Sequence, residues 1–201
     1  MAVIVEALAR RFSCYLTSIH AEAEDDREVI EYGLFNIFSG ILQILFLALS
    51  AFVFGLVPEV LVYTVFFGTL KRYAGGAHAN RHWVCLWGFT ALAIGSSVIC
   101  SIVSTYVMPH AAIIAAFATL LIVLVKAPVM HPNNPKSPKR LRKFRGIAVA
   151  IAVTQFTVLL GLSLFAPEQI HVITFCASTG GLTAAVTLLL PMPSKIGEEV
   201  D

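Results

Sequence analysis

The stretch Tyr32-GLFNIFSGILQILFLALSAFVFG-Leu56 spans 25 residues and contains no charged side chain. A helix of about 20 apolar residues crosses the roughly 30 Å of hydrocarbon in a bilayer, so this stretch predicts a transmembrane helix over residues 32–56. Of the chain's 201 residues, 58% are apolar and 13% are charged, against about 45–50% and about 25% in a soluble domain. This composition excludes an ordinary water-soluble globule, and a net charge of +2 does not favour nucleic acid as a partner.

Five further apolar segments follow this stretch, and the first of them is short. They span residues 58–70, 83–108, 111–125, 146–166 and 170–190. If all six segments cross, with the N-terminus inside, all 14 Lys and Arg lie in cytoplasmic segments, as the positive-inside rule requires. A re-entrant second segment would place the two most basic loops on opposite sides of the membrane. We therefore predict an all-α integral membrane protein, a single membrane domain over residues 1–201 with six transmembrane helices, the second one short, and both termini cytoplasmic.

An N-terminal amphipathic helix is predicted over residues 1–20, ahead of the membrane spans. Leu8, Phe12 and Leu16 recur at helical spacing among polar residues. This pattern is typical of a helix lying in the membrane interface, and a helix packed on its own bundle would show it as well. Glu6 interrupts the first apolar run, so we expect this segment to be retained and not removed as a signal peptide.

The reactive side chains converge on Lys71-RYAGGAHANRHWV-Cys85. Residues 71–82 of this motif are predicted to form a cytoplasmic loop at the membrane boundary. A cysteine nucleophile works as the thiolate, and His78 is a base that can take the proton from Cys85. On one straight helix, residues seven apart lie about 10 Å apart along the axis, too far for a hydrogen bond. A bend or loop before the next helix is therefore required, and Gly75-Gly76 and Asn80 favour such a break. It would place Cys85 in the first turn of the helix that begins near Trp83, where the helix dipole stabilises a thiolate.

Two other interpretations of this motif stay open on the residues alone. His78, His82 and Cys85 fit one helix face and form a set of metal ligands, although the motif contains no Asp or Glu to act as general base beside a metal-bound water. The histidines and Trp83 are also typical of a structural anchor at the membrane interface, with Cys85 as a small apolar residue.

The segment over residues 126–145 contains four prolines and ends in a run of basic residues. We expect an extended, helix-resistant strip that lies near anionic lipid or binds an acidic peptide. Cys100 and Cys176 lie within apolar spans, where a buried structural thiol is expected.

Five polar or small residues elsewhere have a specific interpretation. Gln155 and His171 are expected to form hydrogen bonds between helices or to face a cavity. The pair Gly180-Gly181 is expected to allow close helix packing. Glu31, at the entrance of the first span, is a candidate to orient an imidazole, to pair with a basic residue such as Lys71 or Arg72, or to act as a capping charge.

Taken together, these residues resemble the AgrB (accessory gene regulator protein B) family of membrane cysteine endopeptidases. The resemblance covers nearly the whole chain. The motifs that carry it are Glu31-YG-Leu34, the short span ending in Lys71-Arg72, Gly76-Ala-His78, Trp83-Val-Cys85, and Ala127-Pro128 before the Pro-rich basic loop.

The resemblance implies that the protein processes a small quorum-sensing propeptide at the bacterial inner membrane, with the active site on the cytoplasmic side. His78 would be the general base. Cys85 would be the nucleophile that releases the C-terminal tail of the propeptide and holds the remainder as a thioester, from which a thiolactone or lactone ring closes. The resemblance implies neither a cofactor nor a metal.

The resemblance also implies a set of substrate-binding residues. Its members are Glu31, Lys71, Arg72, Gly75 and Gly76, together with Lys136, Lys139 and Arg140 of the basic loop. Some relatives have Arg at the position of Lys71, and Lys cannot reproduce a bidentate Arg contact.

Two rival functions come from other classes of protein. One is a small transporter or exporter whose basic cytoplasmic loops recruit a peptide, and the other is a metal-dependent membrane hydrolase that uses His78, His82 and Cys85. The expected partners are a short propeptide and the lipid bilayer, with no nucleic acid. A homodimer is compatible with a six-span chain this small, because such a chain has little interior of its own.

Overall fold

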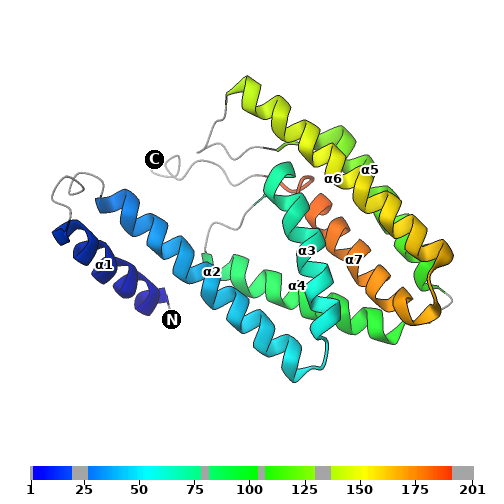
Figure 1. Cartoon of the computed structure of the whole chain (residues 1–201), viewed down its shortest axis with the longest axis horizontal. Helices are drawn as coiled ribbons and strands as arrows, with labels where there is room; N and C mark the ends of the chain where they lie inside the picture. The colour runs from blue at the N-terminus through cyan, green and yellow to red at the C-terminus, as the bar shows by residue number, and fades with distance from the viewer. Residues whose placement is uncertain (1, 20–26, 78–81, 104–106, 130–136, 192–201) are drawn as a thin grey trace, which may run out of the picture. The chain divides into compact units, whose positions relative to one another are not determined.

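A computed structural model describes residues 2–19, 27–77, 82–103, 107–129 and 137–191 of the 201-residue chain. These residues form seven α-helices and contain no strand beyond one isolated bridge (Figure 1). The helices are α1 (Ala2–Ile19), α2 (Arg27–Val53), α3 (Val57–Ala74), α4 (His82–Ile102), α5 (Met108–Lys126), α6 (Pro138–Phe165) and α7 (Glu168–Val186). The prediction of an all-α protein is confirmed. The chain divides into two compact units, residues 1–53 and residues 54–201.

The first unit consists of α1 packed on α2. Val5, Ala9 and Ser13 are buried and recur every four residues, so they form one stripe along α1. The rings of Phe12 and Phe38 add an edge-to-face contact between the two helices, with centroids 5.5 Å apart. Large apolar side chains of α1 are nevertheless exposed, and these are Leu8, Phe12, Tyr15 and Leu16. The predicted N-terminal helix is confirmed, and its place in the membrane interface stays a prediction.

Helix α2 carries the apolar stretch that predicted the first membrane span. Its 27 residues extend about 40 Å, which is longer than the hydrocarbon layer of a bilayer. Only Ser39, Leu47 and Ala51 are buried. The remaining surface of the helix is mostly apolar and exposed, as expected for a helix that contacts lipid.

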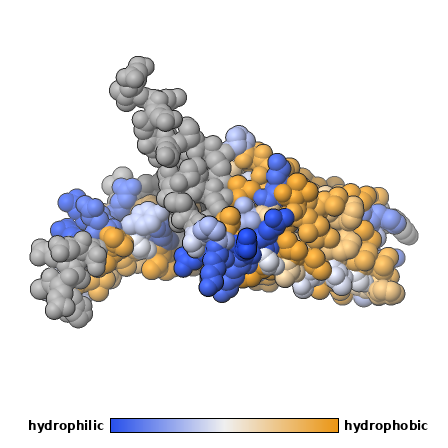
Figure 2. Space-filling model, turned by 90° about the horizontal axis from the view of Figure 1, so that it is seen from above, coloured by the Kyte–Doolittle hydropathy of each residue, from blue (hydrophilic) through white to orange (hydrophobic). Residues whose placement is uncertain are grey.

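Three helices of the described residues are long and apolar enough to cross a membrane by length and composition, namely α2, α5 and α6. A shorter apolar helical segment, Leu86–Ile102, lies within α4. The space-filling view shows large hydrophobic areas on the surface, with hydrophilic side chains gathered in separate patches (Figure 2). A soluble protein rarely exposes an apolar area of this extent. Six crossings stay a prediction.

The boundaries of α3 and α4 differ from those predicted. Helix α3 has 18 residues and continues through Lys71 and Arg72 to Ala74, so residues 71–74 of the predicted loop over residues 71–82 are helical. Lys, Arg and Ala are good helix formers, which explains why the helix does not stop at the first charge. Helix α4 ends at Ile102 and does not reach residue 108 as predicted.

The expectation of an extended strip up to residue 145 is wrong for its last part. Helix α6 begins at Pro138, so residues 139–145 form its first two turns. Proline fits the first turn of a helix because the amide hydrogen that it lacks has no intrahelical partner there. Lys, Arg and Leu then favour the helix that follows.

Helix α7 is the centre of the second unit and packs on α3, α4, α5 and α6. Its buried residues are mostly small, and they are Thr174, Cys176, Ala177, Ser178, Gly180, Gly181, Ala184 and Ala185. A Cβ placed on Gly180 would lie 2.5 Å from the main-chain oxygen of Tyr63 in α3. Small residues let two helix backbones approach this closely. The predicted close packing at Gly180-Gly181 is confirmed.

A buried amide also joins two helices of this unit. The Gln155 Nε2 in α6 donates hydrogen bonds to the main-chain oxygen of Phe66 at 3.1 Å and to Thr69 Oγ1 at 3.2 Å, both in α3. The expectation for Gln155 is therefore confirmed. The two ring nitrogens of His171 are buried and have no hydrogen-bond partner within the described part of the chain, so the same expectation is not confirmed for His171.

Helices α3, α5 and α7 run in the same direction, and the segments that follow them are joined by hydrogen bonds at one end of the unit (Figure 1). Every described Lys and Arg of this unit lies at that end, near the C-termini of α3 and α5 or in the first turns of α6. Glu59 and Glu168 lie in the first turns of α3 and α7, at the opposite end. Alternating crossings of the five predicted segments in this unit would produce such a separation of charges.

Replacing Gly180 by alanine tests the close contact between α7 and α3. The added Cβ has to displace the Tyr63 backbone, and overpacking of this kind costs about 1–3 kcal/mol. We expect the melting temperature of the full chain in mild detergent to fall by several degrees. In the matched control Gly161→Ala, the new Cβ meets nothing within 4 Å, so the melting temperature should hold or rise. An equal effect of both variants would contradict the packing described above.

Candidate active site

The chain leaves α3 through a glycine turn that consists of residues 75–77. Gly75 has φ 77° and ψ −132°, and Gly76 has φ 100°. These are backbone conformations that residues with a Cβ rarely adopt, so the two glycines end the helix at Ala74. The amide of Gly75 still donates to the Lys71 main-chain oxygen at 3.1 Å. The predicted bend at Gly75-Gly76 is confirmed.

Two distant segments hold the glycine turn from outside. The Val129 amide, three residues after α5, donates to the Ala74 oxygen at 2.9 Å, and the Gly76 amide donates to the Val129 oxygen at 3.2 Å. The Ala77 amide donates to the main-chain oxygen of Thr187, directly after α7, at 2.8 Å. The backbone of the turn is therefore bonded to the ends of two other helices.

The glycine turn leaves no room for side chains at its two glycines. A Cβ on Gly75 would collide with the main-chain oxygen of Val129. A Cβ on Gly76 would lie 2.6 Å from Thr187 Oγ1 and 2.8 Å from the Thr187 main-chain oxygen. Both glycines are required by their conformation and by the close approach of the neighbouring segments.

The ammonium group of Lys71 is bound within the protein. Its Nζ lies 2.8 Å from the main-chain oxygen of Ala77 and 2.7 Å from Thr187 Oγ1. The Thr187 hydroxyl in turn donates to the Ala184 oxygen at 2.7 Å. Lys71 therefore closes the glycine turn from the α3 side. Its predicted contact with substrate stays a prediction.

The two predicted catalytic residues follow the glycine turn along the chain. His78 is the next residue after Ala77, and it lies outside the described residues. Helix α4 begins at His82, so Cys85 is the fourth residue of the helix and stands in its first turn, as predicted. The Cys85 side chain is also not among those that the structure describes. The hydrogen bond between His78 and Cys85 stays a prediction.

The predicted metal set also lies outside the described side chains. The described residues contain no group of three His, Cys, Asp or Glu side chains able to hold a metal ion. Because the set formed by His78, His82 and Cys85 is not among them, this alternative is untested.

Basic side chains surround the end of α3. Arg72 is exposed, with its guanidinium carbon 5.9 Å from the centre of the Tyr73 ring. Tyr73 makes an edge-to-face contact with Phe144 of α6, with ring centroids 5.8 Å apart. This contact joins the basic first turns of α6 to the end of α3. Lys139 and Arg140 are exposed in those turns, and Lys136 lies outside the described residues.

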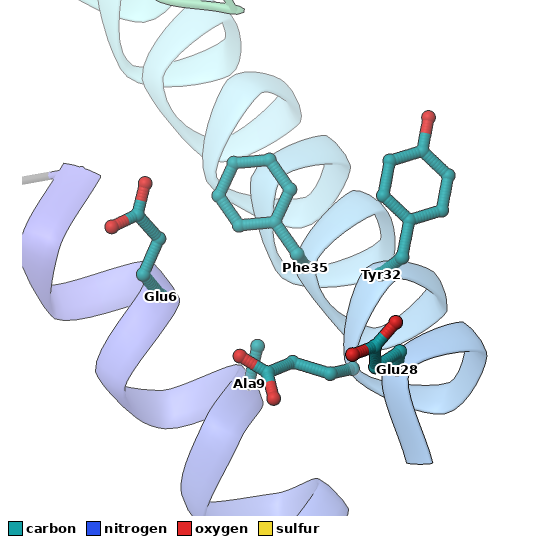
Figure 3. A pocket seen from close by; sticks show the side chains of 6 residues that line it. Glu6, Ala9, Glu28, Tyr32 and Phe35 are labelled. Atoms are coloured by element: carbon teal, nitrogen blue, oxygen red, sulfur yellow. The ribbon is translucent and has the colours of Figure 1, made fainter. Parts of the chain in front are cut away.

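Glu31 belongs to the first unit, where it lines a recess of about 420 Å³ between α1 and α2. The other lining residues are Glu6, Ala9, Glu28, Tyr32 and Phe35. Figure 3 shows Glu6 on α1 and the Phe35 ring on α2 extending toward α1. Three carboxylates thus share this recess, and the predicted roles of Glu31 toward an imidazole or a basic residue stay predictions.

The remaining cysteines agree with their expected roles. Cys100 in α4 and Cys176 in α7 are completely buried. Cys14 is exposed and accepts a hydrogen bond from Arg27 Nη2 at 2.9 Å. The prediction of buried structural thiols is confirmed for Cys100 and Cys176.

Sequence reasoning missed Thr187 and Val129, which hold the glycine turn. Neither belongs to a reactive motif, and both are distant from Gly76 along the chain. The only signal in the sequence was the Ala127-Pro128 pair, which precedes Val129 directly.

These features define an all-helical membrane protein whose reactive motif stands at the basic end of a helical unit. The chain belongs to the AgrB family, because the family model described as accessory gene regulator B matches residues 6–188. Proteins of this family take part in the processing of autoinducing peptides, the signals of bacterial quorum sensing.

Two curated relatives come from Clostridium perfringens. The chain is 24% identical over 171 residues to a "Putative AgrB-like protein" of strain SM101, which covers 81% of this chain and 79% of the relative. It is 26% identical over 163 residues to "Putative AgrB-like protein 2" of strain 13, which covers 73% of this chain and 76% of the relative. No solved structure matches the chain.

Thiol labelling tests the surroundings of the cysteines. With a maleimide reagent on the full chain in mild detergent, Cys14 should react within minutes, while Cys100 and Cys176 should react only after unfolding, because their side chains are inaccessible. Peptide mass spectrometry assigns each label. Rapid labelling of Cys100 or Cys176 in the folded protein would contradict their burial between α4 and α7.

Proposed function

We propose that this protein is a membrane cysteine endopeptidase that removes the C-terminal tail of a small quorum-sensing propeptide and promotes closure of its ring. The observation that supports this function best is the anchored glycine turn. It ends at Ala77, one residue before His78, and the next helix carries Cys85 in its first turn. Membership of the AgrB family supplies the class of substrate.

In the first step, the Cys85 thiol transfers its proton to His78, and the thiolate attacks the carbonyl carbon of the peptide bond before the tail. The carbon–nitrogen bond breaks, and His78 returns the proton to the departing amine. The tail leaves with a free amino group. The remaining peptide is held as a thioester on Cys85.

In the second step, a thiol or hydroxyl within the bound peptide attacks the thioester carbonyl. His78 accepts the proton of this group, the bond to the Cys85 sulfur breaks, and Cys85 recovers a proton. The product is a thiolactone or lactone ring. A thioester retains enough free energy for this transfer, and a site bordered by the membrane slows the competing attack by water.

The start of α4 supplies favourable electrostatics for both steps. The amides in the first turn of a helix have no intrahelical acceptor and carry a partial positive charge. They stabilise the thiolate of Cys85 and can donate hydrogen bonds to the oxyanion that forms during attack. The exposed side chains of Arg72, Lys139 and Arg140 offer positive charge for engaging the substrate at the same end of the unit.

We further propose that all six predicted segments cross the bacterial cell membrane with the basic end of the second unit in the cytoplasm. The common direction of α3, α5 and α7 and the gathering of Lys and Arg at one end support this topology. The propeptide then meets the site at the inner leaflet.

Intact mass measurement tests the reaction. The full chain in mild detergent is mixed with the short peptide encoded beside it. We expect an adduct on Cys85 equal in mass to the peptide without its tail, which hydroxylamine removes. Cys85→Ala and His78→Ala should each lower cleavage by at least about 1000-fold, because each removes one member of the catalytic pair. His82→Ala should keep most of the activity, because His82 is outside this pair.

Full activity of Cys85→Ala would contradict the proposed function. Loss of activity in His82→Ala together with loss of a bound stoichiometric metal would favour the metal-dependent hydrolase. Binding of the peptide without adduct or cleavage, followed by vectorial uptake into sealed vesicles, would favour the transporter.

A further inference from the structure

Thr187 holds Ala77 of the glycine turn in two ways, directly through its main-chain oxygen and indirectly through the bond of its hydroxyl to Lys71. Its main-chain oxygen accepts from the Ala77 amide at 2.8 Å. Its Oγ1 accepts from Lys71 Nζ at 2.7 Å, while the same ammonium group lies 2.8 Å from the Ala77 oxygen. Ala77 is therefore held at its N–H directly and at its C=O through Lys71.

We propose that Thr187 is a positioning residue for the reaction, because it fixes the backbone directly before the catalytic base His78. This inference rests on the proposed function. Consecutive Cα atoms are about 3.8 Å apart, so fixing both peptide groups of Ala77 limits the positions that the next residue can reach. In such sites a displacement of about 1 Å costs about 100-fold in rate.

The hydroxyl of Thr187 is suited to this role by its chemistry. It donates its hydrogen to the Ala184 oxygen at 2.7 Å, which directs an oxygen lone pair away from that acceptor and leaves it to the Lys71 ammonium group. A hydrogen bond from a charged donor is roughly twice as strong as a neutral one. Serine offers the same hydroxyl, whereas valine has the shape of threonine without the acceptor.

Thr187 also stands on a rigid support. Ala184, Ala185 and Leu188 around it are buried in the core of the second unit. A group that orients another residue acts well only if its own backbone is fixed by packing. The end of α7 meets this condition.

In this arrangement the role of Lys71 is to stabilise the glycine turn. An ammonium group that bonds the Ala77 oxygen and the Thr187 hydroxyl stabilises the turn. Arg72, by contrast, is exposed and remains the basic residue of α3 that faces outward. The two adjacent basic residues then have separate tasks.

The test compares Thr187→Val with Thr187→Ser in the full chain, both on a Cys14→Ser background that removes the exposed thiol. The matched control is Thr157→Val, which deletes the same hydroxyl from an exposed position where it bonds only within its own helix. Two quantities are measured. One is kcat and KM for cleavage of the peptide used above, and the other is the rate of Cys85 alkylation by iodoacetamide between about pH 6 and pH 9.

We expect Thr187→Val to lower kcat by about 10- to 100-fold with little change in KM. It should also lower alkylation at the acidic end of the range, because an imidazole that is out of place no longer supports the thiolate. Thr187→Ser should stay within about threefold of the parent, since its hydroxyl keeps the bond. Thr157→Val should behave as the parent in both measurements.

Three results would overturn the inference. They are an unchanged kcat in Thr187→Val, a lowered kcat with the alkylation profile of the parent, and a loss in Thr187→Ser as large as in Thr187→Val. If Thr187→Val does not yield folded protein, Lys71→Met removes the same hydrogen bond from the other side and is read by the same alkylation profile. An unaltered profile in Lys71→Met would also overturn the inference.

Failure of this inference is separable from failure of the proposed function. If cleavage persists in Cys85→Ala, the proposed endopeptidase function is wrong. If cleavage requires Cys85 but is unchanged in Thr187→Val, only the positioning role of Thr187 is wrong.

Discussion

Backbone hydrogen bonding is the constraint on which the basic end of the second unit depends. Where a chain leaves a helix beside hydrocarbon, its free N–H and C=O groups have to find partners within the protein. The glycine turn finds them on Val129 and Thr187, in segments that follow α5 and α7. Because these acceptors and donors are supplied by other helices, the shape of the turn requires the assembled bundle.

The close packing of α7 against α3 brings one of these hydrogen-bond partners, Thr187, to the glycine turn. The contact of Gly180 with the backbone of Tyr63 sets the separation of the two helices near their middle. Farther along, the parallel helices end at the same level, where Thr187 reaches Ala77. The apolar contact at Gly180 thus controls the hydrogen bond between Thr187 and Ala77 at the basic end of the unit. The small residues of α7 and the polar bonds at its end are parts of one arrangement.

Much of the fold follows from local patterns in the sequence. The apolar runs predicted α2 and α5 closely, and the glycine pair predicted the break before His78. The predicted end of α3 and the predicted start of α6 are wrong, because charged residues limit an apolar membrane span whereas Lys and Arg continue a helix well. In the site, the glycine break and a helix start near Trp83 predicted that Cys85 lies in the first turn of α4. Thr187 was missed because its bond to Lys71 joins residues 116 positions apart, and only packing brings them together.

The place of Thr187 along the chain sets an order for biosynthesis. Ribosomes make the N-terminal segments first, so α3 and α4 emerge with Lys71 and Cys85 while α7 is still unmade. The turn before His78 gains its last anchors only when the final helix joins the bundle. The family match itself extends to residue 188, just past this anchor. A nascent or truncated chain that lacks Thr187 therefore carries Lys71 and Cys85 without this anchor, and the glycine turn is completed only when α7 has joined the bundle.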